Sequence, residues 1–157
     1  MAANAQKSIH LKSPDSKLSA DIVVGKTIHY SVSHQGDAML LPSAISMNLA
    51  DGTSFGIDSK LAGSSARLVN TIIDAAVYKK SKIVDNYNEL TLRFKGDYSI
   101  IFRAYNDGIA YRFVSNKKQA FIVQNEQSEF NFPDDSKAYI PYVDDRNGAN
   151  DTFNIFL

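Results

Sequence analysis

The sequence contains no cysteine, carries no net charge and has no long hydrophobic run. Without cysteine, the chain cannot form a disulfide framework, a thiolate metal site or a cysteine nucleophile. Its 17 basic residues balance its 17 acidic ones, so no overall field attracts nucleic acid or an anionic membrane. No apolar run approaches the roughly 20 residues that cross a bilayer. We therefore expect neither nucleic acid nor a membrane as a partner.

The chain has 157 residues, the usual size of one domain. Residues 1–6 lack the basic start and the apolar stretch of a signal peptide. Their small, polar composition indicates a cloning remnant or the end of a processed leader. We therefore treat residues 7–157 as a single domain, which at this length buries roughly 68–70% of the surface that its unfolded chain exposes.

The composition and the periodicity predict β structure. Eight tyrosines and nine phenylalanines accompany many Val, Ile and Thr residues, which are enriched in strands. From residue 87 to residue 114, apolar residues such as Leu90, Leu92 and Phe94 alternate with polar ones, as in half-buried strands. Turn signals at residues 96–97 and 106–108 divide this stretch, and the second suits a hairpin that needs positive φ. The pattern predicts an antiparallel meander of three strands.

Further strands are predicted on both sides of the meander. Between residues 58 and 78, the spacing of Leu61, Leu68 and Ile72 leaves a helix open as an alternative. The predicted strands cover residues 9–12, 18–24, 27–33, 45–49, 121–123, 130–132 and 138–140. Many half-buried strands in one domain are most simply satisfied by two packed sheets, an all-β antiparallel sandwich.

Several segments, in this order and spacing, resemble the N-terminal domain of glycoside hydrolase family 97. Most specific are residues 87–90 (YNEL) and 102–113 (FRAYNDGIAYRF), which follow Ser13-Pro14-Asp15 with Leu18, Tyr30-Ser31-Val32, Pro42-Ser43 with Leu49, and Asp51-Gly52. This family is similar to α-glucosidases and α-galactosidases and includes polysaccharide-degrading enzymes of gut bacteria. The resemblance covers nearly the whole chain.

The resemblance implies a galactose-mutarotase-like β-super-sandwich that packs against a (β/α)8 catalytic barrel. The domain would support the barrel and shape its pocket for α-glycoside hydrolysis, and it would be inactive alone. The family's catalytic carboxylates, and most carboxylates that bind its calcium ion, would follow residue 157. The expected partners are the barrel and the parent enzyme's oligosaccharide substrate, and the expected location is periplasmic or secreted. The family often has tryptophan near residues 138–142 and this chain has none, so the sugar specificity stays open.

The candidate contact residues lie near the end of the chain. The acidic and amide residues of segment 144–151 crowd oxygen ligands as a calcium loop does, but they lack the EF-hand register and its closing glutamate. A turn that approaches the barrel is the favoured interpretation. Aromatic residues from 139 to 156 would form either a sugar platform or a patch that the barrel covers. The residues predicted to contact carbohydrate or the barrel are Tyr139, Tyr142, Asp144, Asp145, Arg146 and Asn147.

Charged residues of the meander form a second candidate cluster. Glu89, Arg93, Arg103 and Arg112 would either grip a sugar or the barrel, or form cross-strand ion pairs on a solvated face. The histidines share no metal-ligand spacing, so no catalytic residue and no metal ligand is predicted in this chain. Two other functions stay open: an independent carbohydrate-binding module, and an assembly domain that pairs through a strand edge.

Overall fold

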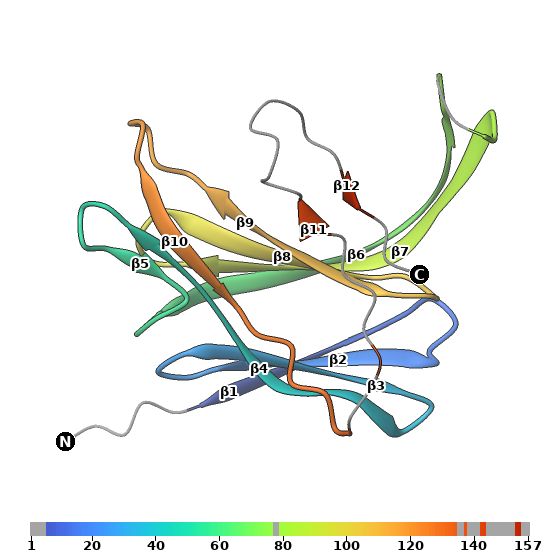
Figure 1. Cartoon of the computed structure of the whole chain (residues 1–157), viewed down its shortest axis with the longest axis horizontal. Coiled ribbons are helices and arrows are strands. Elements are labelled where there is room, and N and C mark those ends of the chain that lie inside the picture. Colours follow the sequence, from blue (N-terminus) through green and yellow to red (C-terminus); the bar gives the residue numbers. More distant parts are fainter. Residues whose placement is uncertain (1–5, 77–78, 135–136, 138–141, 144–152, 155–157) are drawn as a thin grey trace.

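The computed structural model describes residues 6–76, 79–134, 137, 142–143 and 153–154. Within these residues every regular element is a β-strand, and the strands form two antiparallel sheets and a short separate pair (Figure 1). This part of the chain holds no helix of the length and apolarity that a membrane crossing requires. The helix considered for residues 58–78 is wrong, because residues 61–74 form one strand.

The first sheet has the order β1-β2-β3-β4-β10, and the short β5 also pairs with β4. Strands β1 to β4 follow one another along the chain, whereas β10 returns from much later in the sequence to lie beside β4. The strands of this sheet are β1 (Lys7–Lys12), β2 (Leu18–Val24), β3 (Ile28–His34), β4 (Asp37–Leu49), β5 (Ser54–Phe55) and β10 (Val123–Ser128).

The second sheet has the order β6-β7-β8-β9 and is a meander of consecutive antiparallel strands. It confirms the predicted three-stranded meander and adds one strand in front of it. Figure 1 shows the two sheets stacked on each other, with β6 and β7 continuing beyond the stack. The remaining strands are β6 (Leu61–Asp74), β7 (Lys82–Phe94), β8 (Tyr98–Ala104), β9 (Ile109–Ser115), and the separate pair β11 (Tyr142–Val143) and β12 (Phe153–Asn154).

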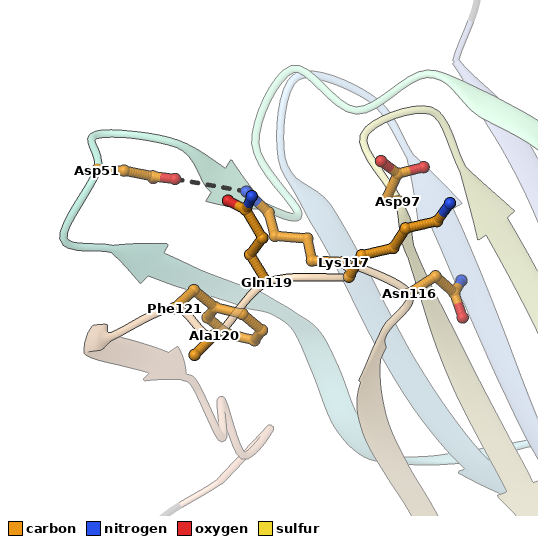
Figure 2. Close-up of a pocket in the computed structure, with 8 residues that line it drawn as sticks. Asp51, Asp97, Asn116, Lys117, Gln119, Ala120 and Phe121 are labelled. Atoms are coloured by element: carbon orange, nitrogen blue, oxygen red, sulfur yellow. Dashed lines mark hydrogen bonds and ion pairs between the residues drawn. The ribbon is translucent and has the colours of Figure 1, made fainter.

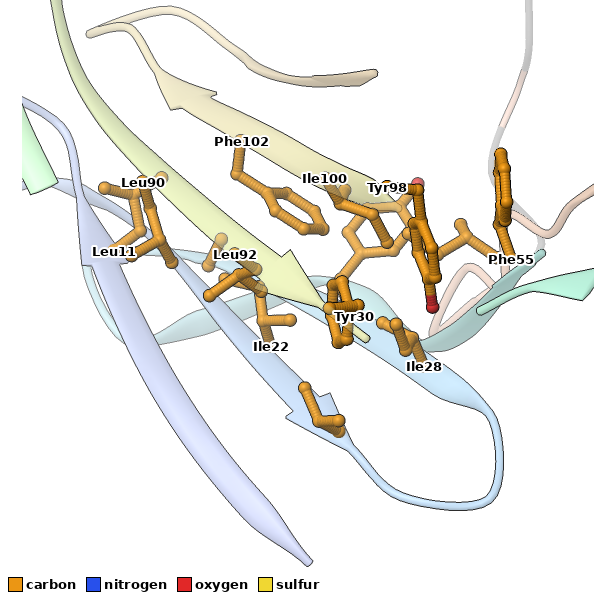
Figure 3. Close-up of a cluster of buried hydrophobic side chains, with 14 of the residues drawn as sticks. Leu11, Ile22, Ile28, Tyr30, Phe55, Leu90, Leu92, Tyr98, Ile100 and Phe102 are labelled. Atoms are coloured by element: carbon orange, nitrogen blue, oxygen red, sulfur yellow. The ribbon is translucent and has the colours of Figure 1, made fainter. Parts of the chain in front are cut away.

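The core lies between the two sheets, where the strands direct alternate side chains inward (Figure 3). Ile22 and Ile28 of the first sheet and Ile100 and Phe102 of the second have no exposed surface. Burying a side chain of this kind contributes about 1.5–3 kcal/mol relative to leaving it exposed. The alternation that predicted the meander therefore reflects this buried face.

A buried tyrosine ties the two sheets together. The ring of Tyr98 on β8 stacks on that of Phe55 on β5, with centroids 4.3 Å apart. The Tyr98 hydroxyl accepts a hydrogen bond from the Gly56 N–H at 3.0 Å and also hydrogen-bonds the Ser59 hydroxyl. Gly56 has a φ of 91°, and a Cβ there would lie 2.6 Å from the carbonyl oxygen of Ile45. Glycine is therefore required at position 56, where the backbone passes close to β4 of the same sheet.

Strand β4 is longer than predicted, and it contains a proline at a bulge. The prediction covered residues 45–49, whereas the strand begins at Asp37. Pro42 lies where the register with β3 shifts: Leu40 pairs with Val32 and Ser43 with Tyr30, which leaves one extra residue on β4. Proline has no N–H for the ladder and is tolerated at such bulges.

Two details near the end of the described chain differ from the predictions. Residues 123–128 form one strand, so the strands expected at 121–123 and 130–132 are misplaced; the one at 138–140 lies outside the described residues. The turn at residues 106–108 is confirmed, since the Tyr105 N–H donates to the Gly108 carbonyl at 2.8 Å. None of residues 106–108 has a positive φ, however, so the expectation that this turn needs positive φ was wrong.

Candidate functional site

Three charged side chains form a row across the outer face of the second sheet, the face turned away from the core. Arg67 of β6, Glu89 of β7 and Arg103 of β8 lie opposite one another in the strand register. Arg67 Nε donates to Glu89 Oε1 at 2.6 Å, and Arg103 Nε donates to Glu89 Oε2 at 2.8 Å. Each carboxylate oxygen therefore has its own guanidinium partner, an arrangement that strengthens both hydrogen bonds.

Glu89 is held as a buried anion, although it lies on the outer face. It is 4% exposed. The hydrogen bond from Arg67 is the largest cause that lowers the pKa of Glu89; burial opposes it, and the hydrogen bond from Arg103 adds to it. The guanidinium carbon of Arg103 lies 4.3 Å from the ring centroid of Tyr87, and that ring lies 5.0 Å from the ring of Tyr105. The cluster thus fixes three strands to one another.

This arrangement does not supply acid–base chemistry for glycoside hydrolysis. A glycosidase needs a general acid whose pKa is raised, so that it can protonate the leaving oxygen. In the described part of the chain, four carboxyl groups have their pKa lowered, because each accepts hydrogen bonds that favour the ionised form: Asp15, Asp51, Glu89 and Glu129. Both oxygens of Glu89 are also occupied. The charged row is a structural element.

The predicted charged cluster is only partly assembled. The ion pair between Glu89 and Arg103 is confirmed, but Glu89 is buried instead of solvated. Arg93 Nη1 instead donates to the Ser65 hydroxyl at 3.1 Å. Arg112 lines a hollow of about 130 Å³ together with Arg103, and it also lines a larger cleft beside β9. Of the four predicted residues, Glu89 and Arg103 are therefore the two that the structure joins directly.

Arg67 is a cluster member that the sequence did not reveal. Its partner, Glu89, was placed correctly on a strand, and Arg103 was placed on the next one. Arg67 lies in the segment that was left open between strand and helix. Only a strand puts Arg67 opposite Glu89, so firm assignment of β6 was the signal needed to find the second guanidinium.

A polar pocket of about 420 Å³ opens where the turn after β4, the turn after β7 and the segment after β9 meet (Figure 2). Asp51 Oδ2 accepts a hydrogen bond from Lys117 Nζ at 3.4 Å, and Asp51 Oδ1 accepts from the N–H and the hydroxyl of Thr53 at 2.9 and 2.6 Å. The ring of Phe121 packs against Phe55 and the core. The pocket offers hydrogen-bonding groups to a polar ligand, but this ring does not provide a sugar-stacking platform.

A cleft of about 480 Å³ with a mixed apolar and polar lining lies between β9 and β10. The Tyr111 hydroxyl hydrogen-bonds the Ser128 hydroxyl across it at 2.7 Å. Burial raises the pKa of Tyr30, which lines the cleft, to about 12, so its phenol stays neutral. Met47 and Phe113 add apolar surface. Arg112 and Glu126 also line the cleft, so it combines apolar surface with one charge of each sign.

The contact residues predicted near the end of the chain remain predictions. Tyr142 lies in β11, where it pairs with Asn154 of β12, and its side chain is not described. The other five lie outside the described residues: Tyr139, Asp144, Asp145, Arg146 and Asn147. Among the histidines, His10 pairs with Asp21.

A family described as "Glycosyl-hydrolase 97 N-terminal" matches residues 11–154. The chain belongs to glycoside hydrolase family 97. This confirms the resemblance identified from the motifs. The N-terminal position of the matched family also agrees with the supporting domain that the resemblance implied.

Two curated relatives show how much of a family 97 enzyme this chain represents. A retaining α-galactosidase of Bacteroides thetaiotaomicron is 43% identical over 154 residues, which is 98% of this chain and 23% of the relative. A probable retaining α-galactosidase of Streptomyces bingchenggensis is 28% identical over 131 residues, 81% of this chain and 20% of the relative. The chain therefore spans less than a quarter of each of these relatives.

Solved structures confirm the fold. A family 97 enzyme of Pseudoalteromonas sp. strain K8, in complex with panose, superposes with a TM-score of 0.73 at 24% identity, covering 85% of this chain and 22% of that one. A β-arabinopyranosidase superposes with a TM-score of 0.74 at 26% identity, covering 94% of this chain and 26% of that one. The predicted sandwich of two antiparallel sheets is thus confirmed, and the chain is the non-catalytic N-terminal β-sandwich domain of a family 97 enzyme.

Proposed function

We propose that the parent enzyme hydrolyses α-galactosides, and that this domain supports a separate catalytic barrel without taking part in the chemistry. The observation that carries the proposal is the 43% identity, over 98% of the chain, to a retaining α-galactosidase. The family 97 enzyme crystallised with panose is 24% identical over 85% of the chain. Sequence similarity therefore favours a galactoside over the ligand of that more distant structure.

The geometry of the domain supports this division of labour. Glu89 uses both carboxylate oxygens to hold Arg67 and Arg103, and its lowered pKa, caused chiefly by the Arg67 hydrogen bond, keeps it ionised. The row joins β6, β7 and β8 on the face away from the core, while Tyr98 joins the two sheets inside it. A scaffold fixed on both faces of one sheet is suited to holding a neighbouring domain in place.

The substrate is tested with the full-length enzyme and nitrophenyl glycosides. We expect the highest kcat/KM on the α-galactoside, compared with the α-glucoside and the β-arabinopyranoside. We expect no hydrolysis by the 157-residue chain under the same conditions. A full-length enzyme that prefers the α-glucoside would refute the proposed substrate, and hydrolysis by the short chain would refute the supporting role. Titration of the short chain with millimolar galacto-oligosaccharide tests the carbohydrate-binding alternative in the same preparation.

The calcium ion and the periplasmic or secreted location also belong to this proposal, and both rest on the family resemblance. In the part of the chain that the structure describes, no group of three His, Cys, Asp or Glu side chains is placed to hold a metal ion. We therefore assign no calcium ligand to these residues. Elemental analysis of the purified full-length enzyme tests the ion, and fractionation of the producing bacterium tests the location.

A further inference from the structure

The hairpin of β6 and β7 extends well beyond the sandwich. The two strands pair from Leu61 opposite Phe94 to Asp74 opposite Lys82. Strand β8 pairs with β7 only as far as Asn88. Residues 68–74 and 82–88 therefore form an arm that is almost entirely two-stranded, visible in Figure 1 as the green hairpin that curves away from the sandwich.

The arm exposes a cluster of aliphatic side chains. Leu68, Ile72 and Val84 are 65%, 65% and 70% exposed, and Ile72 lies directly opposite Val84. Because side chains alternate along a strand, these three lie on one face of the arm, the same face that carries Leu90 into the core. On the other face, the exposed Ile73 lies opposite Ile83. Both faces of a narrow hairpin thus present aliphatic surface to the surroundings.

Such an arm is poorly suited to standing alone in water. An isolated two-stranded hairpin is marginally stable, and it normally needs a third strand or a packed surface. Contiguous exposed apolar groups on a folded domain mark an interaction surface. On the face of Ile72, the flanking pairs are the amides Asn70 and Asn86 and the opposite charges Asp74 and Lys82. The surface has no net charge, which fits an apolar and neutral partner surface.

The size of the arm indicates which partner covers it. A stable interface between separate proteins takes about 20–30 residues on each side. The arm offers 14, namely residues 68–74 and 82–88. A domain tethered in the same polypeptide needs less surface, because the tether gives it a high effective concentration. The chain spans only 23% of its α-galactosidase relative, so most of such an enzyme is available as a tethered partner.

We propose that the aliphatic face of the arm, carried by Leu68, Ile72 and Val84, packs against the catalytic domain of the same polypeptide. The inference rests on the proposed function in requiring such a domain, but it does not depend on the substrate. A second copy of this chain and open solvent are the competing occupants.

Hydrogen exchange distinguishes these occupants. Backbone amides of residues 68–74 and 82–88 are compared between the 157-residue chain and the full-length enzyme. We expect exchange to be about tenfold or more slower in the full-length enzyme, because local opening of the arm is suppressed by packing. Equal exchange in both proteins would overturn the proposal. Protection that grows with concentration in the 157-residue chain would also overturn it, in favour of a second copy.

A matched pair of substitutions in the full-length enzyme provides the second test. Ile72→Lys places a charge on the arm, and Ile122→Lys places the same charge at a comparably exposed isoleucine, 72% exposed, away from the arm. We expect calorimetry to show a separate, earlier transition for the N-terminal domain in Ile72→Lys and a single joint transition in Ile122→Lys. Ile72→Thr, which keeps a β-branched side chain, should show a weaker separation if the fold is intact.

The outcomes separate this inference from the proposed function. If Ile72→Lys and Ile122→Lys melt alike, the arm is not the docking surface, whatever the enzyme hydrolyses. If the arm is protected but the full-length enzyme leaves α-galactosides intact, the docking surface stands and the proposed substrate falls.

Discussion

Replacing Glu89 by glutamine tests the charged row directly. Glutamine keeps the shape of the side chain, but only one of its two terminal atoms accepts a hydrogen bond, so its amide nitrogen faces a guanidinium that has only donors. A hydrogen bond to a charged group contributes about 1.5–3 kcal/mol. Arg67 is 62% exposed and regains water, whereas Arg103 is 29% exposed and stays partly desolvated. We expect the free energy of unfolding to fall by about 2 kcal/mol, within that range.

The measurement is urea unfolding of the 157-residue chain, followed by circular dichroism because the chain has no tryptophan. In a thermal scan of a domain of this size, the same loss of about 2 kcal/mol lowers the melting temperature by about 4–8 °C. The control is Glu126→Gln, which neutralises an exposed carboxylate on β10 and is expected to change stability by less than about 0.5 kcal/mol. Equal effects of the two substitutions would refute the structural role of the row.

The pH dependence of the same variant checks the electrostatic part. Hydrogen bonding by Arg67 lowers the pKa of Glu89 in the folded state, so the unfolded chain takes up a proton first as the pH falls. The stability from Glu89 is fully present above its ordinary pKa of 4.5 and is lost as the pH falls through the lowered folded pKa. The urea midpoint should therefore drop less steeply below about pH 4.5 in Glu89→Gln than in the wild type. Parallel acid limbs would contradict this assignment.

Two further predictions concern Gly56 and Tyr98, with Gly36 in the turn between β3 and β4 as a reference, and all are measured by thermal unfolding. Gly36→Ala should cost about 1–2 kcal/mol for its left-handed backbone alone, since nothing lies within 4 Å of the added Cβ. Gly56→Ala adds a clash with the Ile45 carbonyl oxygen and should cost about 2–5 kcal/mol; equal costs would exclude that clash. Tyr98→Phe removes the acceptor of the Gly56 N–H and should cost about 1–3 kcal/mol, and an unchanged melting temperature would show that this hydrogen bond is dispensable.

The sequence predicted those strands that are buried on one face only. In β7 and β8, inward residues such as Leu90 and Phe102 are apolar and their neighbours are mostly polar, so a period of two is visible. Strand β10 is exposed along its whole length and shows no such period. The prediction followed aromatic residues instead and placed strands at 121–123 and 130–132. Phe121 packs against the core from a loop, and Phe130 is exposed.

The uncertainty over β6 has a geometric cause. Leu68 and Ile72 are four residues apart, and a spacing of four fits both a strand, as twice its period, and a helix, as about one turn. In the structure both side chains are exposed, and Ile73 on the opposite face of the arm is exposed too, so this segment lacks the alternation of buried and exposed residues that marks a half-buried strand. The same uncertainty hid Arg67, because its pairing with Glu89 exists only if residues 61–74 form a strand.

Strand β4 is synthesised well before β10, the strand that pairs with its edge. The Ser46 hydroxyl donates to Gln127 Oε1 across a separation of 81 residues. At synthesis rates of about 5–20 residues per second, β4 waits on the order of 4–16 s for this partner. During that interval the backbone groups of β4 that later face β10 are unpaired, and an unpaired strand edge accepts strands from other chains. This edge of β4 is therefore open to pairing with another chain until β10 has been synthesised.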